Sequence, residues 1–271
     1  MKLVNIDYPF YQKRMFQVLN IFSFIAVLVV NGMANAIPLG GNTTGDISAL
    51  YPNLFVPAGL TFSIWGVIYL TLAVFVIYQA RDLFSKEQKK MPFLRSISWY
   101  FFISCLANVG WIFSWHYRQA LLSLIMMLLL LFNLIVIYLR LDIAKQPVDS
   151  ATGYSVFLPF SLYLGWITVA TIANITAVLV RYNWSGWGLS EEFWTVLVIM
   201  AGALIALINI IQRGDIAYSA VIIWAFLGII IKRYSADSQP IMTIVFTAGL
   251  AIVLIMAGLL FFRKKNIVEA S

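Results

Sequence analysis

Charged residues are scarce in this 271-residue chain: 11% are Asp, Glu, Lys or Arg and 62% are hydrophobic, whereas about a quarter of residues are charged in soluble proteins. Cys105 is the only cysteine, so an intramolecular disulfide and a CxxC or Cys/His metal cluster are excluded. His116 is the only histidine. We therefore set aside Ser-His-Asp, Cys-His and multi-histidine chemistry, and predict neither a catalytic nor a metal site.

The apolar residues gather in long runs without Asp, Glu, Lys, Arg or His. About 20 such residues cross the roughly 30 Å of bilayer hydrocarbon, and in lipid they must be helical. We predict an all-α, polytopic transmembrane bundle of about eight spans, of which the seventh, at 16 residues, is the least secure. Because the runs hold no charge, an ion- or proton-coupled carrier is disfavoured. The runs are residues 16–37, 58–78, 97–114, 119–139, 156–180, 193–211, 216–231 and 241–262.

Fourteen of the 18 Lys and Arg residues fall in the two tails and the even-numbered connections, on one side of the predicted membrane. The positive-inside rule makes that side, and both termini, cytoplasmic. The net charge of +7 is then explained by topology and by contact with anionic lipid, and not by nucleic acid. We expect the bacterial cytoplasmic membrane. The first run also resembles a signal peptide with an A-x-A-like site at Ala34 to Ala36, so its cleavage stays open.

The connection after the first run, residues 37–55, is nearly twenty residues long and rich in Gly, Asn, Thr and Pro. It precedes Pro57, which suits the first turn of a helix. We predict that this connection is a lid over a pocket mouth, while a plain linker remains an equal alternative. We expect His116, in a short outer turn, to face solvent or lipid headgroups. The lid residues are Pro38, Asn42, Pro52 and Pro57.

Three of the runs carry Trp, Tyr or Asn at spacings of three, four, seven or eight residues, which places them on one helix face. Such faces either pack against neighbouring helices, with Asn in an interhelical hydrogen bond, or line a pocket. We predict a ligand site between the second, third and fifth helices. Its residues are Trp65 and Tyr69, Asn108 and Trp111, and Tyr163, Trp166, Ala170 and Asn174.

In order and spacing, the same residues resemble the TspO/MBR family (tryptophan-rich sensory protein, translocator protein) over roughly residues 16–183. The resemblance implies a five-helix bundle whose pocket, lidded by the loop after helix one, binds porphyrins and related flat hydrophobic molecules. It implies that Trp65 and Asn108 contact the ligand and that Trp166 forms part of the pocket wall. No cofactor is required, and porphyrin or haem would be a ligand.

The chain also departs from that family. Val56 replaces the first of two prolines, Leu162 replaces another proline, and the last three runs have no counterpart among five-helix members. We therefore predict two units, a TspO-like core at residues 1–185 and an appended three-helix module at residues 186–271. The residues do not specify an oligomeric state, and a homodimer stays open.

Three functions follow from these features. The leading hypothesis is a non-enzymatic membrane binding protein or sensor, whose partners are a tetrapyrrole-like small molecule and membrane lipid. One alternative is an enzyme of light- or oxygen-dependent porphyrin breakdown. The other is a non-catalytic assembly factor whose last three helices dock onto a partner complex.

Overall fold

The computed structural model describes residues 10–37, 39–234 and 240–270, and within these ranges all regular structure is helical. This confirms the predicted all-α bundle. The α-helices are α1 (Phe10–Ala36), α2 (Thr44–Ala49), α3 (Ile64–Ala80), α4 (Pro92–Ile97), α5 (Tyr100–His116), α6 (Ala120–Arg140), α7 (Ser150–Thr152), α8 (Leu158–Arg181), α9 (Glu191–Arg213), α10 (Ile216–Tyr234) and α11 (Met242–Ala270). Shorter turns are the 3-10 segments η1 (Leu39–Gly41), η2 (Gly59–Ser63) and η4 (Gly186–Gly188), and the π-helical η3 (Gly153–Phe157).

Seven helical segments in the described ranges are long and apolar enough to cross a membrane, and the protein is an integral membrane protein. They are Tyr11–Ala34, Gly59–Ala80, Ala120–Arg140, Ser150–Arg181, Glu191–Arg213, Ile216–Tyr234 and Met242–Phe262. The sequence predicts that the seventh run is the shortest span, but α10, which covers this run, has 19 residues. The short span is instead the third, where α5 has 17 residues because Ser98, at a φ of 49°, ends α4 and turns the chain before Tyr100.

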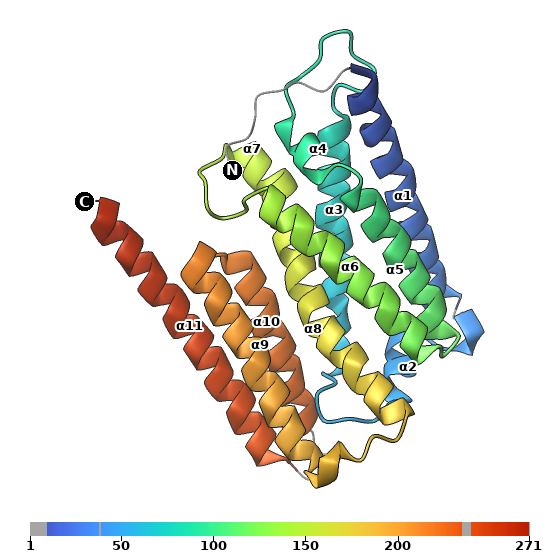
Figure 1. The fold of residues 1–271 in the computed structure, drawn as a ribbon, viewed down its shortest axis with the longest axis vertical. Coiled ribbons are helices and arrows are strands. Elements are labelled where there is room, and N and C mark those ends of the chain that lie inside the picture. The colour runs from blue at the N-terminus through green and yellow to red at the C-terminus, as the bar shows by residue number, and fades with distance from the viewer. Residues whose placement is uncertain (1–9, 38, 235–239, 271) are drawn as a thin grey trace.

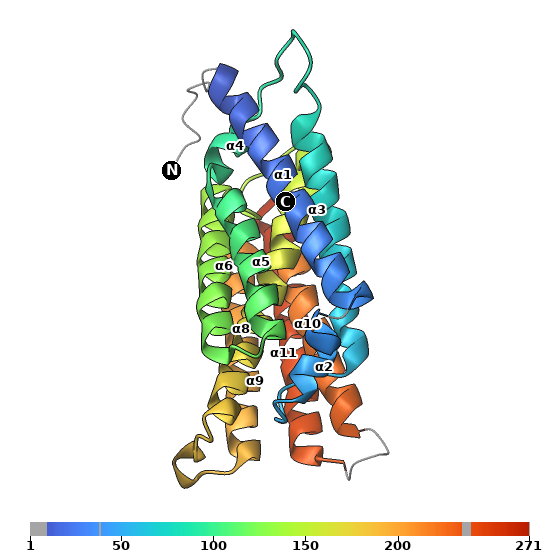
Figure 2. The ribbon, with the colours of Figure 1, turned by 90° about the vertical axis from the view of Figure 1, so that its right-hand side faces the viewer.

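The helices form two groups that lie side by side (Figure 1, Figure 2). In the first, α5 packs on α1 and α6, α8 packs on α6, and α3 contacts α1 and α8. In the second, α9, α10 and α11 pack on one another, and α10 joins this group to α8. Gly165 of α8 allows the close approach, because a Cβ there would lie 3.0 Å from the Tyr218 carbonyl oxygen of α10.

The start of α1 and the end of α11 lie at the same end of the bundle, together with α4 and α7 (Figure 1). The opposite end carries α2. Successive long helices run in alternating directions between these ends (Figure 1), as short helix-to-helix connections favour.

Pro57 does not begin a helix, contrary to the sequence prediction. Ala58 is the extended N-cap residue of η2, with φ −60° and ψ 149°, and α3 begins only at Ile64. The Ala58 N–H donates a hydrogen bond to the Gly228 carbonyl of α10, at 3.0 Å. The segment before η2 is therefore tied to α10.

The connection after α1 is structured, so the plain-linker alternative does not describe it. Thr43 and Asp46 form a capping box at the start of α2, an arrangement that satisfies two otherwise unpaired N–H groups. The buried α2 residues Thr44 and Ser48 face the bundle. The indole Nε1 of Trp115 donates to the Thr44 carbonyl at 3.2 Å, which fixes α2 against α5.

The expectation that His116 faces solvent or headgroups is wrong. The side chain is 2% exposed, with Nε2 3.2 Å from the Thr44 hydroxyl and Nδ1 3.1 Å from the Leu39 carbonyl oxygen. Polar groups of the long connection itself supply the partners that water was expected to supply. His116 thus joins the end of α5 to the first residue of η1 and the first residue of α2.

We expect His116→Ala to free α2 while leaving the bundle folded. Two hydrogen bonds to this segment are lost, at about 0.5–1.5 kcal/mol each, so local opening should become roughly tenfold or more frequent. Hydrogen exchange of the α2 amides measures this opening. Tyr117→Ala is the matched control, because the neighbouring Tyr117 side chain is 61% exposed. Unchanged α2 exchange beside a lower melting temperature would contradict the assignment.

Candidate functional site

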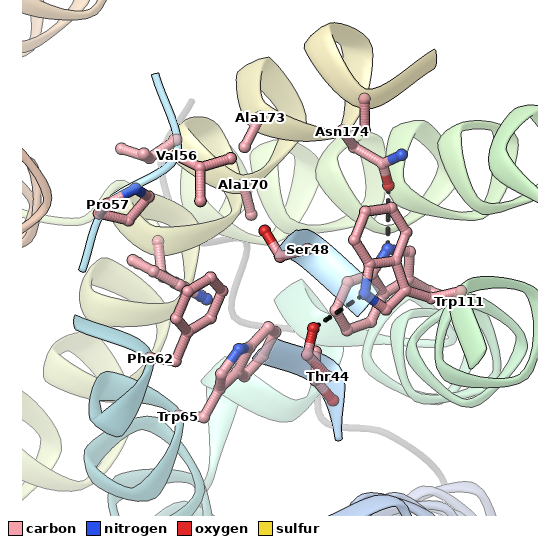
Figure 3. A pocket seen from close by; sticks show the side chains of 14 residues that line it. Thr44, Ser48, Val56, Pro57, Phe62, Trp65, Trp111, Ala170, Ala173 and Asn174 are labelled. Carbon is pink, nitrogen blue, oxygen red and sulfur yellow. Dashed lines mark hydrogen bonds between the residues drawn. The ribbon is translucent and has the colours of Figure 1, made fainter. Parts of the chain in front are cut away.

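A hollow opens between α2, the segment before η2, α3, α5 and α8 (Figure 3). It contains about 570 Å³ of empty space, including its open mouth, but the centre of a water-sized sphere reaches only about 50 Å³. Its lining is largely apolar, and within the described ranges of the chain it contains no charged side chain. The lining residues are Thr44, Ser48, Val56, Pro57, Phe62, Trp65, Trp111, Trp115, Trp166, Val169, Ala170, Ala173, Asn174 and Ala177.

Four rings stack in succession, and we call Tyr69, Trp65, Trp111 and Trp115 the aromatic row; the three tryptophans line the hollow and Tyr69 does not. Successive ring centroids are 5.5, 5.8 and 6.0 Å apart, with interplanar angles of 22°, 28° and 20°. Trp166 of α8 meets Trp65 edge-on at 6.0 Å and 83°. Each such contact contributes about 0.5–1.5 kcal/mol beyond area burial. Indoles from three helices therefore border one hollow.

Trp111 and Trp166 differ in whether the indole N–H makes a hydrogen bond. The Nε1 of Trp111 donates to Asn174 Oδ1 at 3.0 Å (Figure 3), and Asn174 Nδ2 donates to the Ser123 hydroxyl at 3.0 Å. Asn174 thus links α5, α6 and α8. Trp166 is 3% exposed, yet its Nε1 has no acceptor within the described part of the chain. Trp166 is therefore a lining residue whose buried ring N–H donates no hydrogen bond within the described residues.

The structure brings together five of the eight predicted ligand residues on the hollow: Trp65, Trp111, Trp166, Ala170 and Asn174. Tyr69, Asn108 and Tyr163 do not line it. Asn108 is fully buried; its Oδ1 accepts from Asn31 Nδ2 at 2.8 Å, and its Nδ2 donates to the Tyr163 hydroxyl at 3.1 Å. Asn108 is therefore held in an interhelical hydrogen-bond network, the alternative left open by its spacing.

Among the predicted lid residues too, some line the hollow and others do not. Pro57 is buried and lines the hollow, whereas Asn42 is half-buried, Pro52 is exposed, and neither lines it. Pro38 lies outside the described residues. Thr44 and Ser48 of α2 cover the hollow instead, and Figure 3 shows them facing Phe62 and Pro57 across it.

Sequence reasoning missed several lining residues, although some left a signal. The Thr43-x-x-Asp46 pattern is typical of a helix start, and it would have placed Thr44 and Ser48 one turn apart on α2. Trp115 lies one turn beyond Trp111 on the predicted face. The other missed positions have apolar side chains that periodicity cannot distinguish from core: Val56, Phe62, Val169, Ala173 and Ala177.

Fold and site together define an integral membrane protein built from helices, with an uncharged, tryptophan-lined hollow between them. A family model described as TSPO-like protein matches residues 17–261. The chain belongs to this family, which confirms the resemblance found in the sequence. The match extends through α9 and α10 and most of α11. No curated protein and no solved structure matches the chain. The division into residues 1–185 and 186–271 stays a prediction.

Proposed function

We propose that this protein binds a flat, hydrophobic, tetrapyrrole-like molecule in the hollow, as a sensor or regulator and not as an enzyme. The observation that supports the proposal most is the convergence of Trp65, Trp111 and Trp166 from three helices on one uncharged space. Indole faces offer stacking area to a planar ring. The unused Nε1 donor of Trp166 would give a ligand one orienting hydrogen bond in a largely apolar site.

The dimensions of the hollow add a condition to the proposal. A buried water needs about 10–15 Å³ of space reachable by its centre, so 50 Å³ holds only a few waters and no macrocycle. Ligand entry therefore requires movement of α2 or of the segment at residues 53–62. Since no charged side chain among the described residues lines the space, the part of the ligand that enters must be uncharged, with any acidic groups left at the mouth.

We also propose that the chain lies in a bacterial cytoplasmic membrane with both termini in the cytoplasm. The connections richest in Lys and Arg lie at the end that holds the start of α1 and the end of α11 (Figure 1). The positive-inside rule assigns that end to the cytoplasm. The hollow and α2 then face the outer side.

We expect protoporphyrin and haem to quench tryptophan fluorescence of the purified protein saturably in the dark. Trp166→Phe keeps the ring and removes the donor, so affinity should fall about two- to tenfold, the value of one hydrogen bond. Trp65→Leu removes a stacking face from the centre of the row and should weaken binding further. Trp99→Phe is the control, because Trp99 is 45% exposed and does not line the hollow.

Parallel titrations in light separate the alternatives. Loss of the ligand's absorbance band only under illumination would favour the porphyrin-breakdown enzyme. Absence of saturable binding by the wild-type protein to any flat hydrophobic ligand would overturn the proposal and favour the assembly factor. Equal weakening by Trp99→Phe and Trp166→Phe would place the ligand away from the hollow.

A further inference from the structure

One wall of the hollow is held from outside by α10. This wall, which we call the entry segment, comprises residues 53–62 and supplies Val56, Pro57 and Phe62 to the lining. The Ala58 N–H donates to the Gly228 carbonyl at 3.0 Å, and the Trp224 Nε1 donates to the Thr61 carbonyl at 3.0 Å.

Arg233 adds a third attachment near the end of α10. Its Nη2 lies 3.2 Å from the carbonyl oxygen of Asn53 and 3.3 Å from that of Val56. The Asn53 side chain in turn accepts from the N–H groups of Phe55 and Val56, at 3.1 and 3.0 Å. The start of the entry segment is thus a turn that is held by hydrogen bonds to the Asn53 side chain, and the Arg233 guanidinium attaches this turn to α10.

Gly228 makes this contact close. A Cβ at residue 228 would lie 2.0 Å from the Thr61 hydroxyl oxygen and 2.9 Å from Pro57 Cβ. Both neighbours belong to the entry segment, so any larger residue must push that segment and α10 apart. On the hollow side the lining side chains of the segment, Val56, Pro57 and Phe62, are apolar, and Phe62 meets Trp166 edge-on at 6.0 Å.

We propose that Trp224, Gly228 and Arg233 of α10 are positioning residues that control opening of the hollow. None of the three lines it; they act through the entry segment, whose outward movement admits a ligand. The last three helices would then set the accessibility of the hollow and, resting on the proposed function, the affinity for its ligand. Loss of one hydrogen bond should raise the open population about two- to tenfold.

Opening can be measured without any ligand. Ser48 lines the hollow and is 8% exposed, so Ser48→Cys in a Cys105→Ala background gives one thiol whose maleimide labelling rate reports access. We expect Trp224→Phe, which keeps an aromatic ring but no donor, to raise that rate about two- to tenfold. Gly228→Ala should raise it at least as much. Leu227→Ala is the control on α10, because Leu227 is 41% exposed.

Melting temperature and ligand affinity complete the test. An unchanged labelling rate in folded Trp224→Phe and Gly228→Ala would overturn the proposal, even if both variants melt earlier, because a purely structural contact lowers stability without opening the hollow. Affinity for protoporphyrin is followed by ligand absorbance, since Trp224 itself fluoresces. Faster labelling with no porphyrin binding by any variant, wild type included, would retain the role of α10 and reject the proposed ligand.

Discussion

Asn108→Asp is expected to destabilise the helix bundle by about 2.5–3.5 kcal/mol, the cost of an aspartate at the centre of a membrane helix. Asn108 is fully buried, and its amide accepts from Asn31 and donates to Tyr163. A carboxylate at residue 108 would still accept from Asn31 but could no longer donate to the Tyr163 hydroxyl. Within the described ranges, no cationic side chain hydrogen-bonds to this position. Thermal unfolding in detergent measures the loss.

Asn183→Asp is the matched control for that variant, because Asn183 is exposed in the connection after α8. The same chemical change there should alter stability by no more than about 0.5 kcal/mol. A wild-type melting curve and yield for Asn108→Asp would show that residue 108 is hydrated, contrary to its position in the structure.

Asp82→Ala is expected to cost roughly 3–5 kcal/mol, because it leaves a buried cation without its partner. Asp82 is 1% exposed and pairs with Lys13, itself 9% exposed. It also accepts from Gln17 Nε2 at 2.7 Å and from the Lys89 N–H at 2.6 Å. This cluster joins the start of α1 to the connection after α3. Glu87→Ala, an exposed acidic position on the same connection, should leave the melting temperature unchanged.

The contribution of Asp82 to the stability of the fold should be lost at acidic pH. Burial raises the pKa of Asp82, but the hydrogen bonds from Lys13, the Lys89 N–H and Gln17 lower it more, so the pKa lies below its usual value. A carboxyl with a lowered folded-state pKa stabilises above its unfolded pKa of about 3.9, and this stability is lost as pH falls through the folded value. The difference in unfolding free energy between wild type and Asp82→Ala should therefore stay constant from pH 7 to 5. It should shrink as the pH falls below about 4. A gap that persists in acid would exclude Asp82 ionisation as its source.

Periodicity was enough to predict the spans and the faces that carry tryptophan. Trp65, Trp111 and Trp166 were placed on helix faces because residues three, four or seven apart align whatever surrounds them. Ala170 and Asn174 followed from the same rule. The charge-free runs likewise gave the spans, apart from the shortening of α5 by the turn at Ser98.

Partners between distant segments could not be predicted, because a spacing identifies a face but not what it meets. The spacing of Asn108 allowed either a ligand contact or an interhelical hydrogen bond, and it did not identify Asn31 of α1, which donates to Asn108. His116 was expected in solvent and contacts Thr44, 72 residues away in sequence. The entry segment depends on Trp224 and Gly228, which no local pattern connects to Pro57.

The aromatic row also determines how the protein will respond optically. Tyr69, Trp65, Trp111 and Trp115 lie at successive centroid spacings of 5.5 to 6.0 Å, close enough for excited-state energy to pass from ring to ring. A chromophore bound against Trp65 would then also quench the fluorescence of the other rings in the aromatic row. Near-ultraviolet dichroism and emission should report these indoles as one coupled unit, distinct from Trp184, Trp187 and Trp194 beyond α8.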